Sequence, residues 1–137
     1  MGIDDIKKLS EFRFEKACSN MKIAKSLYES GEYEVALNRT YYALFDAIRA
    51  INALDGFDSS KHSGVIAYFN HKFVKSKVFS ASTSDVIKKV AALRESSDYE
   101  DFYKADKKET LDIINKVENF LNEVKIYLQR KSIIKWY

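Results

Sequence analysis

The stretch from residue 32 to residue 54 constrains the fold more than any other part of the chain. Its apolar residues recur with the period of a helix and occupy two neighbouring stripes of the helix surface. A helix with so little polar surface is buried on nearly all sides, so other elements have to pack around it. The first stripe contains Leu37, Tyr41, Leu44, Ile48 and Ile51, and the second contains Arg39, Tyr42, Ala43 and Asp46.

The rest of the chain also favours helices over strands. Proline is absent and glycine occurs only four times, so the turn residues expected of a many-stranded protein are missing. Hydrophobic residues make up 46% of the 137 residues, which is enough for one folded core and excludes wholesale disorder. We therefore predict a single all-α domain that spans residues 1–137.

The apolar pattern predicts an up-and-down bundle of four to five antiparallel helices. A helix over about residues 11–30 and the helix over 32–54 form a hairpin, because Gly31 ends the first and leaves a short connection. In the last helix, apolar residues spaced by three and four form a seam from Leu111 to Leu128. The helices predicted after the break at residues 55–61 are a third with Val65, Ile66, Phe69 and Phe73, a fourth over about residues 85–97 and a fifth over about residues 105–130.

Arg39 is the residue that the apolar pattern does not explain. An unpaired guanidinium inside a protein is too costly to retain, because burial removes its hydration. Two interpretations are open. Arg39 belongs to a structural network, paired with Asp46 or with a carboxylate of another helix such as Asp98, or it faces a cleft and binds an anion.

Arg39 belongs to the first of three polar groups that interrupt the apolar pattern. The second group, residues 61–64, opens the third helix, and the third group, residues 94–99, ends the fourth helix. The motifs read R-T-Y-Y-A from Arg39, K-H-S from Lys61 and R-E-S-S-D-Y from Arg94. With these motifs, the chain resembles the HEPN superfamily, in particular a branch that carries corresponding motifs on the second, third and fourth helices.

The resemblance implies a helical bundle that forms homodimers. In many members it also implies a role as the toxin or partner of a minimal nucleotidyltransferase of the MNT type. Active members resemble metal-independent ribonucleases, in which an arginine on the fourth helix is followed four to six residues later by a histidine. The histidine can move the proton of a 2′-hydroxyl, while the arginine stabilises the charge of the phosphorane.

This chain departs from the ribonuclease motif after Arg94. Asp98 and Tyr99 follow where active members have the histidine, and an ionised carboxylate there repels a phosphodiester. His62, at the start of the third helix, could supply the imidazole from elsewhere in the fold. Arg39, His62 and Arg94 are therefore the candidate catalytic residues. The candidate residues of a nucleotide or RNA site are Arg39, Tyr42, Lys61, His62, Ser63, Arg94, Asp98 and Tyr99.

We expect a nucleotide- or RNA-associated partner of a minimal nucleotidyltransferase in a toxin–antitoxin or defence system. Two alternatives stay open. One is a metal-independent endoribonuclease toxin that uses Arg39, His62 and Arg94. The other is a non-catalytic bundle in which the polar groups only fix the packing.

Other sequence features concern ligands, location and surface contacts. We expect no cofactor and no metal site, because the two histidines stand apart from any Cys/His cluster. Cys18 falls in an apolar stripe and is predicted to be a core residue.

No apolar run approaches the roughly 20 residues of a membrane span, and the N-terminus lacks a signal peptide, so we expect a cytoplasmic protein. The apolar tail, residues 132–137, is expected to dock on the bundle or on a partner.

Overall fold

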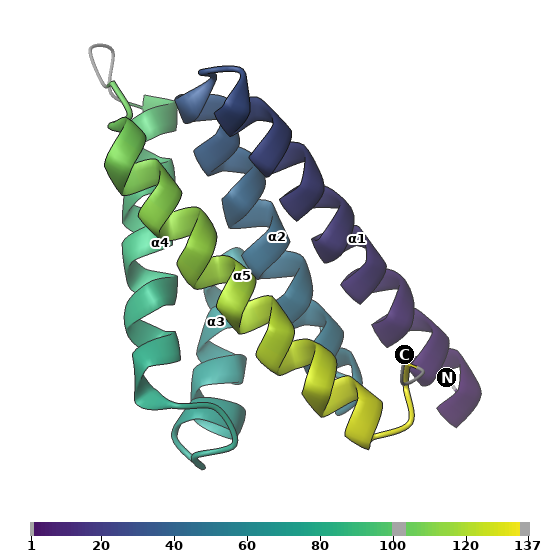
Figure 1. The fold of residues 1–137 in the computed structure, drawn as a ribbon. Helices are drawn as coiled ribbons and strands as arrows, with labels where there is room; N and C mark the ends of the chain where they lie inside the picture. The colour runs from purple at the N-terminus through teal and green to yellow at the C-terminus, as the bar shows by residue number, and fades with distance from the viewer. Residues whose placement is uncertain (1, 100–103, 135–137) are drawn as a thin grey trace.

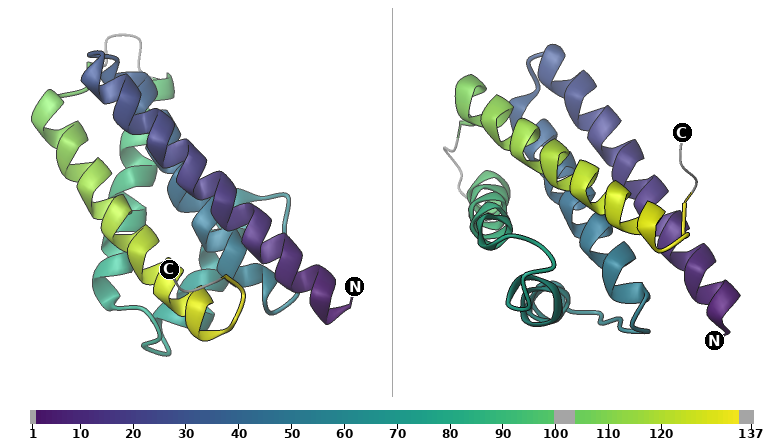
Figure 2. Two further views of the ribbon diagram at one scale, coloured as in Figure 1. Left: turned by 45° about the vertical axis from the view of Figure 1, so that its right-hand side comes forward. Right: turned by 60° about the horizontal axis from the view of Figure 1, so that its bottom comes forward.

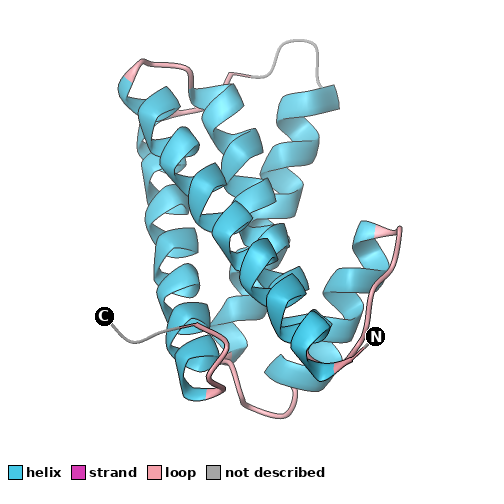
Figure 3. Cartoon of the chain, turned by 90° about the vertical axis from the view of Figure 1, so that its right-hand side faces the viewer, coloured by secondary structure: helices cyan, strands magenta, loops and turns pink. Residues whose placement is uncertain are grey.

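All regular secondary structure in the described part of the chain is helical. The computed structural model describes residues 2–99 and 104–134, without the side chains of residues 97–99. Within these ranges no strand is present (Figure 3), which confirms the predicted all-α bundle. The elements are α1 (Ile3–Glu29), α2 (Tyr33–Ala53), α3 (His62–Phe69), the π-helical segment η1 (Asn70–Val74), α4 (Ala81–Tyr99) and α5 (Lys107–Arg130).

Helix α2 lies at the centre of the bundle. It contacts α1, α3, α4 and α5, and the side chains of Leu44, Ile48 and Ile51 are at most 2% exposed. Figure 1 shows α1 along one side of α2 and α4 along the other, with α5 crossing α2 obliquely. The right-hand view of Figure 2 looks nearly along α3 and α4, which lie together beside α2. The prediction that other elements surround this helix is confirmed.

A tight turn joins α1 and α2 into the predicted hairpin. Gly31 has φ +81°, a left-handed conformation that a side chain would strain, and its amide donates to the carbonyl of Tyr28. Helix α1 begins at Ile3 instead of near residue 11. Asp4 and Asp5 in its first turn stabilise that early start, because acidic side chains favour the positive end of a helix dipole.

The last two helices also differ at their ends from the sequence prediction. Helix α4 begins at Ala81 instead of near residue 85, because residues 81–84 form its first turn around the buried Thr83. Helix α5 begins at Lys107, after Asp106 accepts a hydrogen bond from the amide of Glu109 over 2.8 Å. The buried seam residues of α5 are Ile114, Val117, Leu121, Val124 and Leu128.

Two sequence predictions about the core are changed. Leu111 was predicted to belong to the seam of α5 but is 40% exposed. Cys18 was predicted to lie in the core, which is wrong, because its side chain is exposed at the edge of the groove between α1 and α5. The core-facing stripe of α1 runs through Ala17 and Met21, and Cys18 stands one residue outside it. In the tail, Ile133 is buried in the core, whereas residues 135–137 lie outside the described residues.

Candidate functional site

A cleft of about 530 Å³ lies between α1, α2 and the start of α3. It contains three cationic side chains, Lys16, Arg39 and Arg49, and one carboxylate, Asp46, so its wall has an excess of positive charge. We call it the cationic cleft. Its lining residues are Lys16, Asn20, Asn38, Arg39, Tyr42, Phe45, Asp46, Arg49 and His62.

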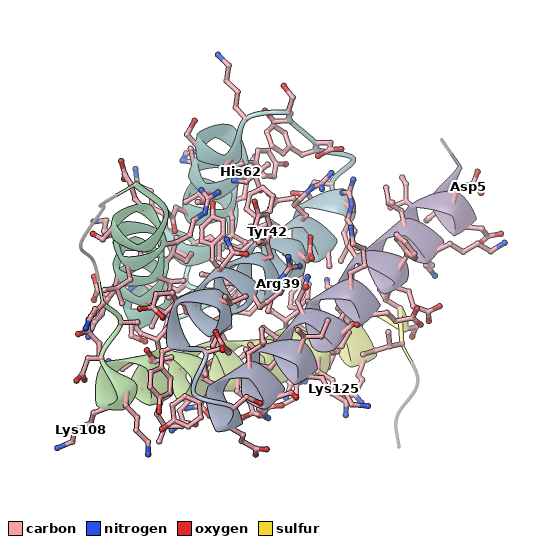
Figure 4. All side chains as sticks on the ribbon, turned by 90° about the horizontal axis from the view of Figure 1, so that it is seen from above. Asp5, Arg39, Tyr42, His62, Lys108 and Lys125 are labelled. Atoms are coloured by element: carbon pink, nitrogen blue, oxygen red, sulfur yellow. The ribbon has the colours of Figure 1, made fainter. Side chains whose placement is uncertain are left out.

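The sequence of α2 supplies most of the cleft from one face of the helix. Arg39, Tyr42, Asp46 and Arg49 follow one another at spacings of three and four, which places their side chains in one row. The opposite residues of α2 are buried against other helices, so this row is the side of α2 on which polar groups can reach solvent. Figure 4 shows Arg39, Tyr42 and His62 together between α1, α2 and α3, with Asp5, Lys108 and Lys125 elsewhere on the bundle.

Asn20 of α1 links the charged residues of the cleft. Its side-chain nitrogen donates to Asp46 Oδ2 over 2.9 Å, and its oxygen accepts from Arg39 Nη1 over 3.4 Å. Arg39 therefore reaches Asp46 through an amide, and no carboxylate among the described side chains forms an ion pair with it. Burial raises the pKa of the Asp46 carboxyl, although Lys16 and the hydrogen bond from Asn20 act in the opposite direction.

His62 forms the aromatic end of the cleft. Its ring centroid lies 4.1 Å from that of Phe45, and its Nδ1 is 2.9 Å from the Tyr41 hydroxyl. Burial, together with the charges of Arg94 and Arg49, lowers the pKa of His62. Its imidazole is therefore neutral near neutral pH and can accept a proton.

Arg94 contacts the aromatic residues next to the cleft and is not among the residues that line it. Its guanidinium carbon lies 4.9 Å from the ring centroid of Tyr41 and 5.7 Å from that of Tyr42. Its Nη2 also donates to the Tyr42 hydroxyl over 3.4 Å. Two of the sequence motifs, on α2 and α4, thus meet through cation–π contacts.

The other four predicted site residues are not among the described residues that line the cleft. Lys61 and Ser63 flank His62 but are exposed and do not line the cleft. Asp98 and Tyr99 belong to α4, and their side chains lie outside the described residues. The structure thus brings together Arg39, Tyr42 and His62, with Arg94 adjoining. Six residues that line the cleft were not among the predicted site residues, namely Lys16, Asn20, Asn38, Phe45, Asp46 and Arg49.

Comparison with known proteins identifies the family. A sequence model of the HEPN domain matches residues 10–127, which is most of the chain. The chain belongs to the HEPN family. This confirms the resemblance that its three motifs indicated.

Three relatives of this HEPN domain match over most of their own length. "Putative toxin MJ0142" of Methanocaldococcus jannaschii is 31% identical over 121 residues, covering 88% of this chain and 82% of the relative. A UPF0332 protein of Thermotoga maritima is 30% identical, covering 89% of this chain and 92% of its own. "Putative toxin MJ0605" of M. jannaschii is 31% identical, and the match covers 88% of this chain and 90% of the relative. Two of these relatives of the HEPN domain therefore carry toxin names.

Two general properties of the described residues bear on ligands and membranes. They contain no group of three or more His, Cys, Asp or Glu side chains arranged to hold a metal ion. None of the helices in the described ranges of this HEPN domain is long and apolar enough to cross a membrane.

The lowered pKa of His62 predicts a specific pH dependence of stability. Between its folded pKa and the ordinary value of about 6.5, the unfolded chain binds a proton that the folded chain does not. The free energy of unfolding therefore falls as the pH drops through this interval. In His62→Gln this part of the decrease should be absent. Urea unfolding at several pH values between 7.5 and 5 measures it.

The matched control is His71→Gln, which removes an exposed histidine outside the cleft. Its pH profile should retain the decrease seen in the wild-type protein. Identical profiles for the wild-type protein and His62→Gln would contradict the environment described for His62.

Proposed function

We propose that the cationic cleft binds the phosphate groups of single-stranded RNA and that the protein acts in a toxin–antitoxin system. The observation that carries this proposal is the convergence of Lys16, Arg39 and Arg49 from two helices on one cleft with a single carboxylate. Nucleic-acid affinity arises largely from such cations, because each phosphate contact releases a bound counterion. The toxin names of two relatives support the biological setting.

The aromatic residues of the cleft favour RNA over an isolated phosphate. Tyr42, Phe45 and His62 line the same cavity as the three cations. Single-stranded nucleic acids bind where cations track the backbone and aromatic rings stack on bases. Arg39 is partly buried and held by Asn20, so its guanidinium is oriented before any ligand arrives.

Replacing Arg39 by glutamine should weaken binding of a short fluorescent single-stranded RNA about tenfold, because hydrogen bonds to charged groups contribute roughly 1.5–3 kcal/mol. The slope of log K against log salt should also become shallower by about 0.7, the value for one phosphate contact with a single strand. Fluorescence anisotropy at three salt concentrations measures both quantities.

Lys108→Gln is the control for this experiment. It makes the same change in net charge at an exposed position of α5, far from Arg39 in Figure 4. Equal loss of affinity in the two variants would show that only total charge matters and would exclude the cleft as the binding site. Displacement of the RNA by AMP at comparable concentration would identify a nucleotide ligand instead.

A second candidate function, metal-independent RNA cleavage, is favoured by the neutral His62 in the same cleft as Arg39. In this reaction an imidazole nitrogen accepts the proton of a 2′-hydroxyl, and the oxygen attacks the adjacent phosphorus. The 5′-oxygen leaves as a hydroxyl, taking a proton from the imidazolium or from solvent, and a 2′,3′-cyclic phosphate remains. Arg39 stabilises the negative charge that develops on the phosphorane.

This second candidate function predicts RNA cleavage in the presence of EDTA. His62→Gln should lower the rate by a factor of about 10² to 10⁴, the usual contribution of a general base. Arg94→Ala should also lower it, because Arg94 contacts the two tyrosines beside His62. Cleavage that persists in both variants, at the rate of His71→Gln, would refute catalysis by this site.

The proposed partner is a minimal nucleotidyltransferase encoded beside this protein, and the proposed assembly is a homodimer. The toxin names of the relatives support a paired system, since a toxin is kept inactive by a cognate antitoxin. When the two proteins are produced together, they should elute as one complex whose mass, measured by light scattering, contains two copies of this chain. Separate elution of a monomer and the transferase would contradict both parts.

A further inference from the structure

Asp58 connects the segment between α2 and α3 to both helices of the first hairpin. One carboxylate oxygen accepts a hydrogen bond from Arg13 Nη2 of α1 over 3.0 Å. Both oxygens lie 3.1 Å from Arg49 Nη2 of α2. The amide of Ser59 donates to the same carboxylate over 2.9 Å. Four donor contacts from three parts of the chain therefore meet at one side chain.

The contact between Asp58 and Arg13 differs from an ordinary surface ion pair. Asp58 is half-exposed, but the side chain of Arg13 is only 10% exposed. Arg13 also donates to the carbonyl of Arg49 over 3.4 Å. Exposed pairs contribute little to stability, whereas a buried guanidinium that loses its carboxylate is left with an uncompensated charge. The contact between Asp58 and Arg13 therefore holds the segment between α2 and α3 against α1, and breaking it is unfavourable.

Asp58 lies outside the cationic cleft, but it contacts or precedes two of the cleft's residues. Arg49 lines the cleft and donates a hydrogen bond to Asp58. His62, which also lines the cleft, follows Asp58 by four residues in the sequence. Between them, the amide of Lys61 donates to Ser59 Oγ over 3.1 Å. A Cβ at Gly64 would lie 3.0 Å from this same oxygen, so Ser59 packs closely on the first turn of α3.

We propose that Asp58 is a positioning residue for the cationic cleft, holding Arg49 and the segment that leads to His62 in the geometry that binds RNA phosphates. This inference rests on the proposed function for its ligand. Asp58 itself touches no ligand. It acts through Arg49 and through the backbone that enters α3.

The charge of Asp58 makes positioning distinguishable from simple electrostatics. Removing a carboxylate near a polyanion site, with no other change, strengthens binding, because repulsion is lost. Loss of positioning weakens binding, because Arg49 and His62 are no longer held at the cleft. Asp58→Asn is nearly isosteric and keeps the size of the side chain. The two explanations therefore predict opposite signs for the change in RNA affinity.

Three variants should be compared by fluorescence anisotropy with a short single-stranded RNA. Asp58→Asn should weaken binding about tenfold, as expected when a charge-assisted hydrogen bond is lost. Asp58→Glu retains the carboxylate and should recover most of the affinity. Asp5→Asn makes the same charge change at the exposed start of α1, far from the cleft in Figure 4, and should not weaken binding. Binding by Asp58→Asn that equals or exceeds the wild-type level would overturn the proposal.

The titration of His62, followed by NMR of its ring protons without RNA, provides a second measurement. His62 faces Tyr41 and Arg49 of α2 and Arg94 of α4, and burial with the two arginines lowers its pKa. Removing the Asp58 charge alone would lower this pKa further, whereas release of the segment would raise it toward its ordinary value. We expect it to rise in Asp58→Asn and to stay unchanged in Asp58→Glu, with the His71 signal as internal reference.

The two measurements separate this inference from the proposed function. If the wild-type protein binds no RNA, the proposed function fails, while a raised His62 pKa in Asp58→Asn still supports the positioning. If Asp58→Asn does not fold, Arg13→Lys replaces it, because Lys keeps the charge at a residue that does not line the cleft. Its effects should have the same direction as those of Asp58→Asn. A His62 titration that Arg13→Lys leaves unchanged would refute the anchoring of Asp58 by Arg13 as a means of positioning His62.

Discussion

Burial of α2 on nearly every side is the constraint on which the rest of the structure depends. Four other helices contact it, and desolvation makes an unpaired charge on such a surface too costly. Its charged residues Arg39, Asp46 and Arg49 therefore share one row, where the packing leaves an opening beside α1 and α3. The cleft thus follows from the same hydrophobic pattern that makes α2 the centre of the bundle. A mutation that shifts α2 would change the core and the cleft together.

The single carboxylate of the cleft reduces repulsion among its cations without cancelling their charge. Asp46 is buried, and its desolvation raises its pKa against the attraction of Lys16 and Arg49. Asn20 connects Asp46 with Arg39, so these two side chains are held by a neutral amide rather than by direct pairing. A direct pair would neutralise Arg39. The bridged arrangement leaves it oriented with its charge available to an anion.

The helical period was sufficient to predict the central helix, the hairpin at Gly31 and, except at Leu111, the core face of α5. The period indicates on which side of a helix each residue lies, but it does not indicate how much of that side a neighbouring helix covers. The prediction of Cys18 as a core residue is wrong for this reason. The cleft residues Lys16 and Asn20 depend on the register between α1 and α2, and no local pattern encodes that register. The anchoring of Asp58 by Arg13 joins residues 45 positions apart, so it too could only be seen in the structure.

The arrangement around His62 separates attraction of a polyanion from proton transfer. A protonated imidazole would add to the positive charge of the cleft, but it could no longer act as a base. Burial of His62 and the nearby charges of Arg94 and Arg49 favour the neutral form. Attraction then falls to Lys16, Arg39 and Arg49, while Arg94, stacked on Tyr41 and Tyr42, influences the site through its field and its ring contacts. The proposed RNA binding needs only the three cations, whereas the proposed cleavage also needs this neutral histidine, so the two proposed functions depend on different parts of one cleft.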